Sequence, residues 1–550
     1  MTAAILETHE VVNQVPPLEG YDAYGADPWL RAAVGRAGAQ WVDASARGLG
    51  VYVGSPEAHH HATLANRYTP ELKTHDRTGF RIDAVEYHPS YHVLMNRAFG
   101  AGVHSLAWKR EAGGFSARAA LFYLWNQLEQ GTACPATMTF ASVAVLEHAP
   151  EIAREWRPKV LADAYDARPA PVSQKAAATI GMAMTEKQGG SDLRAVQTAA
   201  WRDGAAWRLT GHKWFCSAPM SDAFFTLARL PEGVSCFFVP RSLPNGLRNP
   251  FMIQRLKEKV GNRSNASAEI EYRDTLARLV GEPGRGIATL IGMAHYTRFD
   301  IVVGVAGMMR AALNQALHHA RHRSAFGKPL DEHPLMANVL ADLALEAEAA
   351  LLLAFRLASA FDRSKAEPAE RELQRALTPI AKYWLCKRMV AVATESMECL
   401  GGNGYVEEGP LGRLYREAPL NGIWEGSANV ICLDALRALQ RSPESLAALA
   451  QEVAAAHEPR LDARFDAARR LLADSATAEA QARSVVESLA VCVQGSLMKR
   501  HASAASAEAF CVSRVDSSGG GRGFGALALD AEQLDAQFEF EVRVWMSMWK

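Results

Sequence analysis

Several signals that mark particular protein classes are missing from this chain. Its eight cysteines are scattered without a CxxC pair, which argues against a zinc ribbon and favours reduced, packed thiols. The longest clean apolar runs, such as residues 301–309, are far shorter than the about 20 residues that a membrane-spanning helix needs. We therefore expect neither a zinc ribbon nor a membrane span. The cysteines are Cys134, Cys216, Cys236, Cys386, Cys399, Cys432, Cys492 and Cys511.

A strong charge of either sign is also missing. The formal net charge is -1, with 49% hydrophobic and 22% charged residues, which is typical of a soluble globular protein. Nothing in this balance requires a nucleic acid or an anionic membrane as partner. Residues 1–20 have no basic segment followed by an apolar one, so we expect no signal peptide and a cytoplasmic location.

The common metal and nucleotide motifs are absent as well. His59, His60 and His61 are adjacent, so their side chains point in different directions, and a solvated cluster explains them better than a metal site. His88 and His92 have helical spacing but lack an HExxH pattern. No Walker A loop, GxSxG elbow or GxGxxG fingerprint occurs either. No metal is predicted.

The pattern of apolar residues changes three times along the chain and predicts four domains. Residues 1–178 predict an N-terminal helical domain, and 179–282 predict a small antiparallel β-domain or barrel. Residues 283–440 return to helical periodicity, as in a bundle. Residues 441–550 are alanine-rich and predict an additional helical C-terminal domain. The fold class is therefore α+β, mainly α.

Individual elements follow from the same patterns. The expected strands are residues 206–211, 223–228, 235–240 and 268–272, with a turn at 245–246. The expected bundle helices are residues 286–324, 332–363, 368–399 and 428–440. In the C-terminal segment, the glycines of 517–525 are typical of a flexible connection more than of a nucleic-acid-binding repeat. That segment has more acidic than basic residues, a poor electrostatic footprint for DNA.

The carboxylate with the most suggestive surroundings is Glu425. It follows the apolar Ile423 and Trp424 and precedes Gly426 and Ser427, which predict the loop and N-cap of the next helix. Apolar walls raise the pKa of a carboxyl group, which suits a base that removes a weakly acidic proton. A glutamate before a helix N-terminus is also favoured by the helix dipole alone. The stretch by itself leaves both interpretations open.

Four further stretches are each weak signals. Residues 182–192 carry two glycines and hydroxyls that suit a pyrophosphate or the edge of a planar ring, or form a surface turn. Residues 211–217 place aromatic side chains beside a hydroxyl group. This stretch predicts either one wall of a site for a flat cofactor or an ordinary strand. Residues 321–327 come at the end of a predicted helix. Their arginine and phenylalanine suit binding of a phosphate and packing on an adenine, but the stretch is explained almost as well as a structural C-cap. Residues 398–405 are a glycine turn after a helix.

In their order and spacing, these stretches resemble the acyl-CoA dehydrogenases. The resemblance is carried by Thr-Glu-x-x-Gly-Gly-Ser-Asp, Gly-x-Lys-x-Phe, Arg-x-x-Phe-Gly, Leu-Gly-Gly-x-Gly-Tyr, residues 413–416 and Ile-Trp-Glu-Gly-Ser, and it is strong over 180–440. More narrowly, the chain resembles the branch of flavoproteins that respond to DNA alkylation. This resemblance is carried by the sequences of residues 182–192 and 256–266, the long N-terminal region and the added C-terminal domain.

The resemblance implies an acyl-CoA dehydrogenase-like fold, FAD as cofactor and a homotetramer built as a dimer of dimers. It implies that Glu425 takes the α-proton of an acyl-CoA, with Arg298 nearby, while hydride passes to the flavin. It also implies that Arg323 and Phe326 meet the adenylate end of the FAD of a neighbouring subunit, where Gly401 and Gly402 let backbone approach phosphate. The other cofactor-binding residues that it implies are Met182, Met184, Thr185, Gly190, Ser191, Phe215, Ser217, Ile423, Trp424, Gly426, Ser427 and Asn429.

Two functions remain open from the sequence. One is an FAD-dependent oxidoreductase acting on an unidentified or poorly used acyl-CoA, with electron-transfer flavoprotein as a possible acceptor. The alternative is a protective flavoprotein that binds double-stranded DNA with little turnover. Pro334 stands where the family usually has a glutamine, which weakens the adenine side, and Cys216 and Ser217 replace the commoner Ile-Thr pair. No residues for binding coenzyme A emerge from the sequence.

Overall fold

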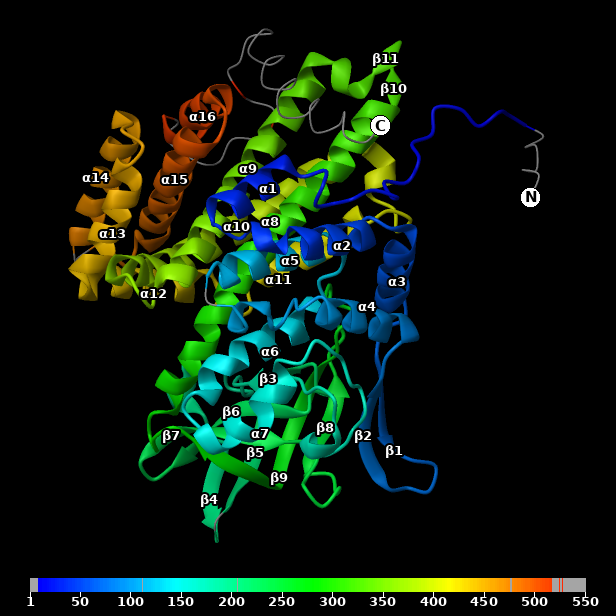
Figure 1. Ribbon diagram of the computed structural model, residues 1–550, viewed down its shortest axis with the longest axis vertical. Coiled ribbons are helices and arrows are strands. Elements are labelled where there is room, and N and C mark those ends of the chain that lie inside the picture. The colour runs from blue at the N-terminus through cyan, green and yellow to red at the C-terminus, as the bar shows by residue number, and fades with distance from the viewer. Residues whose placement is uncertain are drawn as a thin grey trace.

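The computed structural model describes residues 8–110, 112–204, 206–474, 477–516, 524 and 527. The molecule is elongated, with the sheet at one end and long helices running to the other (Figure 1). Helix α8 (Gly286–His322) connects these ends, because it begins beside the sheet and continues along the bundle. Among the described residues, no helix is both long enough and apolar enough to cross a membrane.

The N-terminal region is helical, as predicted, but it also contains a β-hairpin. Strands β1 (Glu71–His75) and β2 (Arg81–Glu86) pair antiparallel and lie beside the main sheet. The sequence prediction missed them because β1 alternates only between exposed and half-buried positions, so it lacks an apolar face. The helices are α1 (Pro28–Arg36), α2 (Asp43–Val53), α3 (Pro56–Arg67), α4 (Pro89–Gly100), α5 (Gly114–Leu128), α6 (Ala133–Leu146) and α7 (Pro150–Val160).

A seven-stranded sheet forms the middle region. Its strands are β3 (Ile180–Ala183), β4 (Ala199–Asp203), β5 (Ala206–Ser217), β6 (Ala223–Leu230), β7 (Gly233–Pro240), β8 (Phe251–Leu256) and β9 (Ser267–Val280). The order is β3-β6-β4-β5-β9-β7, and β7 also pairs with β6, which closes a ring. β8 pairs with β9 outside this path. Most pairings are antiparallel, but β3 and β4 each run parallel to β6.

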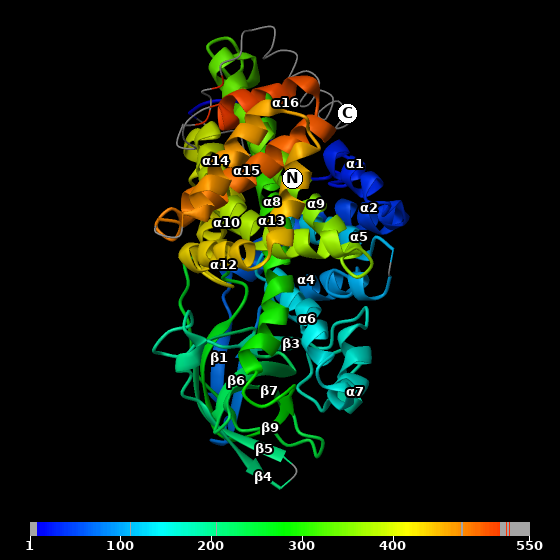
Figure 2. The same cartoon turned by 90° about the vertical axis from the view of Figure 1, so that its left-hand side faces the viewer.

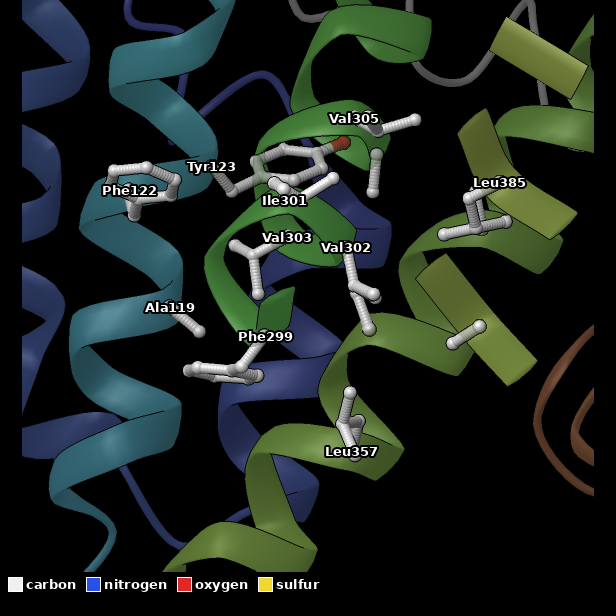
Figure 3. Packing of buried hydrophobic residues seen from close by; sticks show 14 of the residues in the cluster. Ala119, Phe122, Tyr123, Phe299, Ile301, Val302, Val303, Val305, Leu357 and Leu385 are labelled. Atoms are coloured by element: carbon white, nitrogen blue, oxygen red, sulfur yellow. The ribbon is translucent and has the colours of Figure 1, made fainter. Parts of the chain in front are cut away.

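The bundle consists of four helices whose limits lie close to those predicted and of α11, which was not predicted. They are α8, α9 (Pro334–Arg363), α10 (Pro368–Cys399), α11 (Leu411–Asn421) and α12 (Ala428–Arg441). A two-stranded turn of β10 (Ser324–Ala325) and β11 (Lys328–Pro329) joins α8 to α9. Figure 3 shows part of the core, a single buried cluster to which Phe122 of α5, Phe299 and Val302 of α8, Leu357 of α9 and Leu385 of α10 all contribute. This packing fixes α8, which supplies one wall of the site described below.

The C-terminal helices pack on the bundle rather than standing apart from it. They are α13 (Pro443–Ala454), α14 (Pro459–Ala473), α15 (Ala482–His501) and α16 (Ala504–Phe510). They lie along one side of the bundle (Figure 2), and their buried side chains belong to the same core. The predicted boundary at 440 falls one residue before the end of α12. The predicted glycine-rich connection at 517–525 lies outside the described residues, apart from Phe524.

Candidate active site

A cleft of about 2000 Å³ opens where the sheet, α8 and the connection between α11 and α12 meet. It exceeds the about 300–1,000 Å³ of ordinary ligand pockets, so it has room for a large cofactor and a second ligand. The predicted site residues that line it are Met182, Met184, Thr185, Gly190, Ser191, Phe215, Ser217, Arg298, Ile423, Trp424, Glu425, Gly426 and Ser427. The structure therefore brings together stretches that are widely separated in sequence.

Glu425 lies in a tight connection between α11 and α12. Its φ of 57° is in the left-handed region, where a non-glycine residue is uncommon, and Gly426 follows with a φ of 107°. Such conformations cost free energy and persist where the surroundings hold them. Ser427 is the residue before α12, as predicted, but its side chain makes no capping hydrogen bond.

Two cations hold this strained connection by its backbone. Arg298 of α8 donates from Nε to the carbonyl oxygen of Glu425 at 2.9 Å. Lys382 of α10 donates from Nζ to the carbonyl oxygens of Trp424 at 3.0 Å and Gly426 at 2.6 Å. Three consecutive carbonyl groups thus accept hydrogen bonds from charged donors, which are stronger than neutral ones. Both side chains act on the position of Glu425 through its backbone.

The carboxyl group of Glu425 has the properties of a base. Its Oε2 atom is buried and has no hydrogen-bond partner among the described residues. Burial raises the pKa of the Glu425 carboxyl, while the nearby Thr297 hydroxyl and the charges of Arg298 and Lys382 act in the opposite direction. A carboxylate with a raised pKa is a stronger base near neutral pH than an exposed one.

A buried ion pair positions the loop that follows β3. Nζ of Lys213, on β5, lies 2.7 Å from Oε1 of Glu186, and both side chains are fully buried. Glu186 also accepts hydrogen bonds from the backbone N–H groups of Gln197 and Thr198. Burial opposes ionisation of Glu186, but the charge and hydrogen bond of Lys213 outweigh it and lower the pKa of Glu186 to about 2. The pair thereby ties the segment containing Thr185, Gly190 and Ser191 to the sheet.

The lining of the cleft suits a flavin dinucleotide. Phe215 lines the cleft and is 50% exposed, which leaves a large aromatic face for stacking on a planar ring. Thr185, Ser191 and Ser217 bring hydroxyl groups to the same wall. Hydroxyl groups both donate and accept hydrogen bonds, as the edge of a flavin ring and a pyrophosphate require. The donor set and the size of the cleft therefore fit FAD.

Five predicted residues lie away from the cleft in this chain: Arg323, Phe326, Gly401, Gly402 and Asn429. Arg323 donates from Nη1 to the carbonyl oxygen of Asn13, and Phe326 is 97% exposed. Asn429 accepts a hydrogen bond from Arg483 of α15 at 2.9 Å, so its side chain is turned toward the C-terminal helices. The other four were predicted to act on a neighbouring subunit, and that role stays a prediction.

Sequence reasoning missed several residues that shape the site. It gave no role to Lys382, because a lysine inside a long helix has no local signal that it will reach the backbone of another element. Glu186 and Lys213 were noticed within motifs, but their contact depends on how the loop folds back onto β5. Thr297, next to Arg298, also escaped notice.

Known protein families match three consecutive parts of the chain. Residues 13–167 match the adaptive response protein AidB N-terminal domain, residues 181–275 the acyl-CoA dehydrogenase middle domain and residues 284–440 the acyl-CoA dehydrogenase C-terminal domain. With the fold and the site, these matches define the class. The chain belongs to the acyl-CoA dehydrogenase family, and within it to the AidB-like branch.

Particular relatives agree with this assignment. The chain is 44% identical to "Putative acyl-CoA dehydrogenase AidB" of Escherichia coli K12, over 94% of this chain and 96% of that protein. The solved structure of Caenorhabditis elegans ACDH-11 in complex with C11-CoA superposes with a TM-score of 0.81 at 25% identity, covering 98% of this chain and 94% of that one. The structure described as "Bd2924 apo-form" gives a TM-score of 0.82 at 28% identity, covering 88% and 99%. The predicted family, its branch and the fold class are confirmed.

Proposed function

We propose that this protein binds FAD in the cleft and oxidises an acyl-CoA thioester. Glu425 removes the α-proton of the acyl group as the β-hydrogen leaves as hydride. When bound, FAD supplies the hydride acceptor. The observation that carries the proposal is the carboxyl group of Glu425, held at the wall of a large cleft with one oxygen buried and unpaired. The C. elegans relative solved with C11-CoA supports an acyl-CoA ligand.

Residues of this chain have distinct tasks in that proposal. Thr185, Ser191 and Ser217 hold the polar edge of the cofactor, and Phe215 covers one face of its ring. Arg298 and Lys382 keep the carbonyl groups beside Glu425 fixed, so the carboxylate does not have to be ordered when substrate arrives. Met182, Met184, Gly190, Ile423, Trp424, Gly426 and Ser427 complete the walls around the cofactor.

The assembly belongs to the same proposal. Arg323, Phe326, Gly401 and Gly402 would serve the FAD of a neighbouring subunit, because they lie outside this chain's own cleft. We further propose that the protein is a cytoplasmic homotetramer and that electron-transfer flavoprotein accepts its electrons. Sedimentation of the FAD-loaded protein tests the assembly, and variants at Arg323 should lose FAD without changes inside the cleft.

Anaerobic mixing with a panel of acyl-CoA thioesters tests the chemistry. At least one thioester should bleach the flavin absorbance, and Glu425→Gln should abolish bleaching while FAD stays bound. Glu479→Gln is the matched control, because Glu479 is an exposed glutamate between α14 and α15 and does not line the cleft. Absence of bleaching with every thioester in the FAD-loaded wild type would contradict the proposal.

The alternative, a protective flavoprotein that binds DNA, remains a prediction from the sequence. The name of the matched N-terminal family refers to the adaptive response, but it does not mention binding to a nucleic acid. Titration of duplex DNA over a range of salt concentrations tests it, because phosphate contacts give an affinity that falls steeply with salt.

A further inference from the structure

The two ends of the cleft differ in accessibility. The cleft follows α8 from Ile287 to Met308, and at the Ile287 end Ile291 is 52% exposed. At the Met308 end the walls come from α5, α11 and the loop between β8 and β9. Val260 of that loop is 72% exposed, but the polar side chains that line the cleft there are almost completely buried, and we call this buried polar part the closed end. It is also polar, being lined by Asn126 (5% exposed), Gln130 (5%), Asn262 (2%), Glu417 (3%) and Asn421 (8%).

These polar residues form one connected group. The backbone N–H of Asn262 donates to Oε1 of Glu417, and its side-chain Nδ2 lies 3.4 Å from the carbonyl oxygen of Gln130. Gln130 donates from Nε2 to the carbonyl oxygen of Asn126 at 2.6 Å. Gly304 faces Asn126, and a Cβ at that glycine would lie only 3.0 Å from Oδ1 of Asn126. Three separate segments thus converge on one small subsite beside α8.

The subsite contains a buried hydrogen-bond acceptor that has no partner. Oε1 of Gln130 is buried and has no partner among the described residues. Exchanging the oxygen and nitrogen of the Gln130 amide would not satisfy both atoms, because the oxygen would then face the carbonyl oxygen of Asn126. An unpaired buried acceptor is unfavourable, so Oε1 of Gln130 favours a ligand that donates a hydrogen bond.

Glu417 supports the same conclusion. Burial raises the pKa of its carboxyl group to about 7, against the hydrogen bond from Asn262 and the charges of Arg413 and Lys259. Near neutral pH this group exchanges between acceptor-only and donor states, which suits a partner that is both donor and acceptor, such as a hydroxyl group. A hydrocarbon chain end would satisfy none of these atoms.

We propose that the closed end binds the distal end of the acyl group and selects acyl chains that end in a hydroxyl group over hydrocarbon chains of equal length. This inference rests on the proposed function, since it assigns the substrate class of the same cleft. Sites that hydrogen-bond a substrate hydroxyl discriminate strongly against analogues without it, because the buried polar groups are then left unpaired. The expected preference is therefore about tenfold or more.

Matched pairs of thioesters test it in the FAD-loaded protein. Each pair has the same number of heavy atoms in the chain, such as hexanoyl-CoA and 5-hydroxypentanoyl-CoA, and several lengths are compared. The thioester concentration giving half-maximal change in the flavin spectrum, and the rate of flavin bleaching, are measured without oxygen. At the best length the hydroxylated member should bind about tenfold more tightly. Equal or tighter binding of the hydrocarbon members at every length would overturn the inference.

Variants separate this inference from the proposed function. Glu417→Leu and, independently, Asn126→Ala should each reduce the preference for the hydroxylated member, whereas Glu479→Leu, at an exposed site away from the cleft, should not. If Glu417→Leu does not fold, Asn126→Ala alone decides. Loss of FAD from a folded Glu417→Leu protein would assign the subsite to the cofactor and overturn the inference, while the proposed function would stand. If no thioester of either kind perturbs the flavin of the wild type, both fail.

Discussion

At the scale of single residues, the connection around Glu425 combines strain with restraint. Glu425 adopts a left-handed backbone conformation, and Arg298 and Lys382 hold the three carbonyl groups around it. The helix-dipole explanation that the sequence left open does not account for these contacts. A conformation that must be held in place by two charged side chains from other helices indicates that the position of this carboxyl group matters.

The first prediction concerns the pH dependence of this carboxyl group. Because Glu425 removes a proton only when ionised, flavin bleaching by a substrate should be slow at low pH and faster as pH rises through its pKa. Burial raises that pKa, so the midpoint should lie above the about 4.3 of an exposed glutamate. Stopped-flow measurements of bleaching between pH 4 and 9 give this midpoint. A rate that does not change with pH would contradict the assignment of Glu425 as base.

The second prediction concerns Lys382 as a positioning residue. Lys382→Met removes two hydrogen bonds to the connection and should slow bleaching about 10- to 100-fold, because small misplacements of a catalytic group have large effects. It also removes a charge that lowers the pKa of Glu425, so the midpoint should move to higher pH. Lys387→Met on the exposed side of the same helix is the control. A slower rate with an unmoved midpoint would leave Lys382 only a structural role.

At the scale of elements, the sequence predicted the helices better than the sheet. The limits of α8, α9, α10 and α12 lie within two residues of those expected, because long helices carry many repeats of one apolar pattern. Strand β3 is only four residues long and buried at every position, and β4 is mostly exposed, so neither alternates. Their parallel pairing with β6 depends on chain segments far apart, which a local pattern does not encode.

The site residues also fall into those that the sequence predicted and those that it did not. Motifs of contiguous residues identified the cleft-lining stretches around Thr185, Phe215 and Glu425. Contacts between distant segments, such as those of Lys382 with the Glu425 connection, had no sequence signal. The roles predicted for Arg323 and Phe326 involve a second subunit, so one folded chain does not test them.

The third prediction concerns the ion pair that anchors the loop after β3. Lys213→Met leaves Glu186 buried without its counter-charge, so it should destabilise the protein by about 3–5 kcal/mol and weaken FAD binding. The double variant Lys213→Met/Glu186→Gln should be less destabilised than the sum of the two single variants. Thermal unfolding and FAD titration measure both. Arg273→Met, at an exposed pair with Glu271, should cost no more than about 1 kcal/mol.

The same pair has a pH signature. The pKa of Glu186 is lowered to about 2 in the folded protein, whereas an unfolded glutamate titrates near about 4.3. Its contribution to stability is therefore present above the unfolded pKa and is lost as pH falls toward about 2. Lys213→Met should flatten this part of the stability profile. An unchanged slope would show that Glu186 is not ionised in the folded state.

At the scale of the whole molecule, the C-terminal helices share polar contacts as well as a core with the bundle. Arg356 of α9 contacts Glu370 of α10 and Glu452 of α13, each at 2.8 Å, and Arg500 of α15 contacts Glu452 at 2.6 Å. All four side chains are half-buried or more, so these pairs are less screened than surface pairs. The predicted fourth domain is therefore packed as a continuation of the bundle.

The last prediction follows from this packing. A chain that ends at residue 440 exposes the indole of Trp384, which now donates to Gln494 of α15 at 2.7 Å, together with the apolar surface around it. It also removes Glu452, one of the two carboxylate partners of Arg356. We expect such a chain to aggregate and to lose FAD, which size-exclusion chromatography and flavin absorbance would show. A soluble, FAD-loaded chain of residues 1–440 would contradict this. If the prediction holds, loss of DNA binding after deletion of 441–550 says nothing about that segment's surface, and exposed single substitutions such as Arg469→Gln are the proper test.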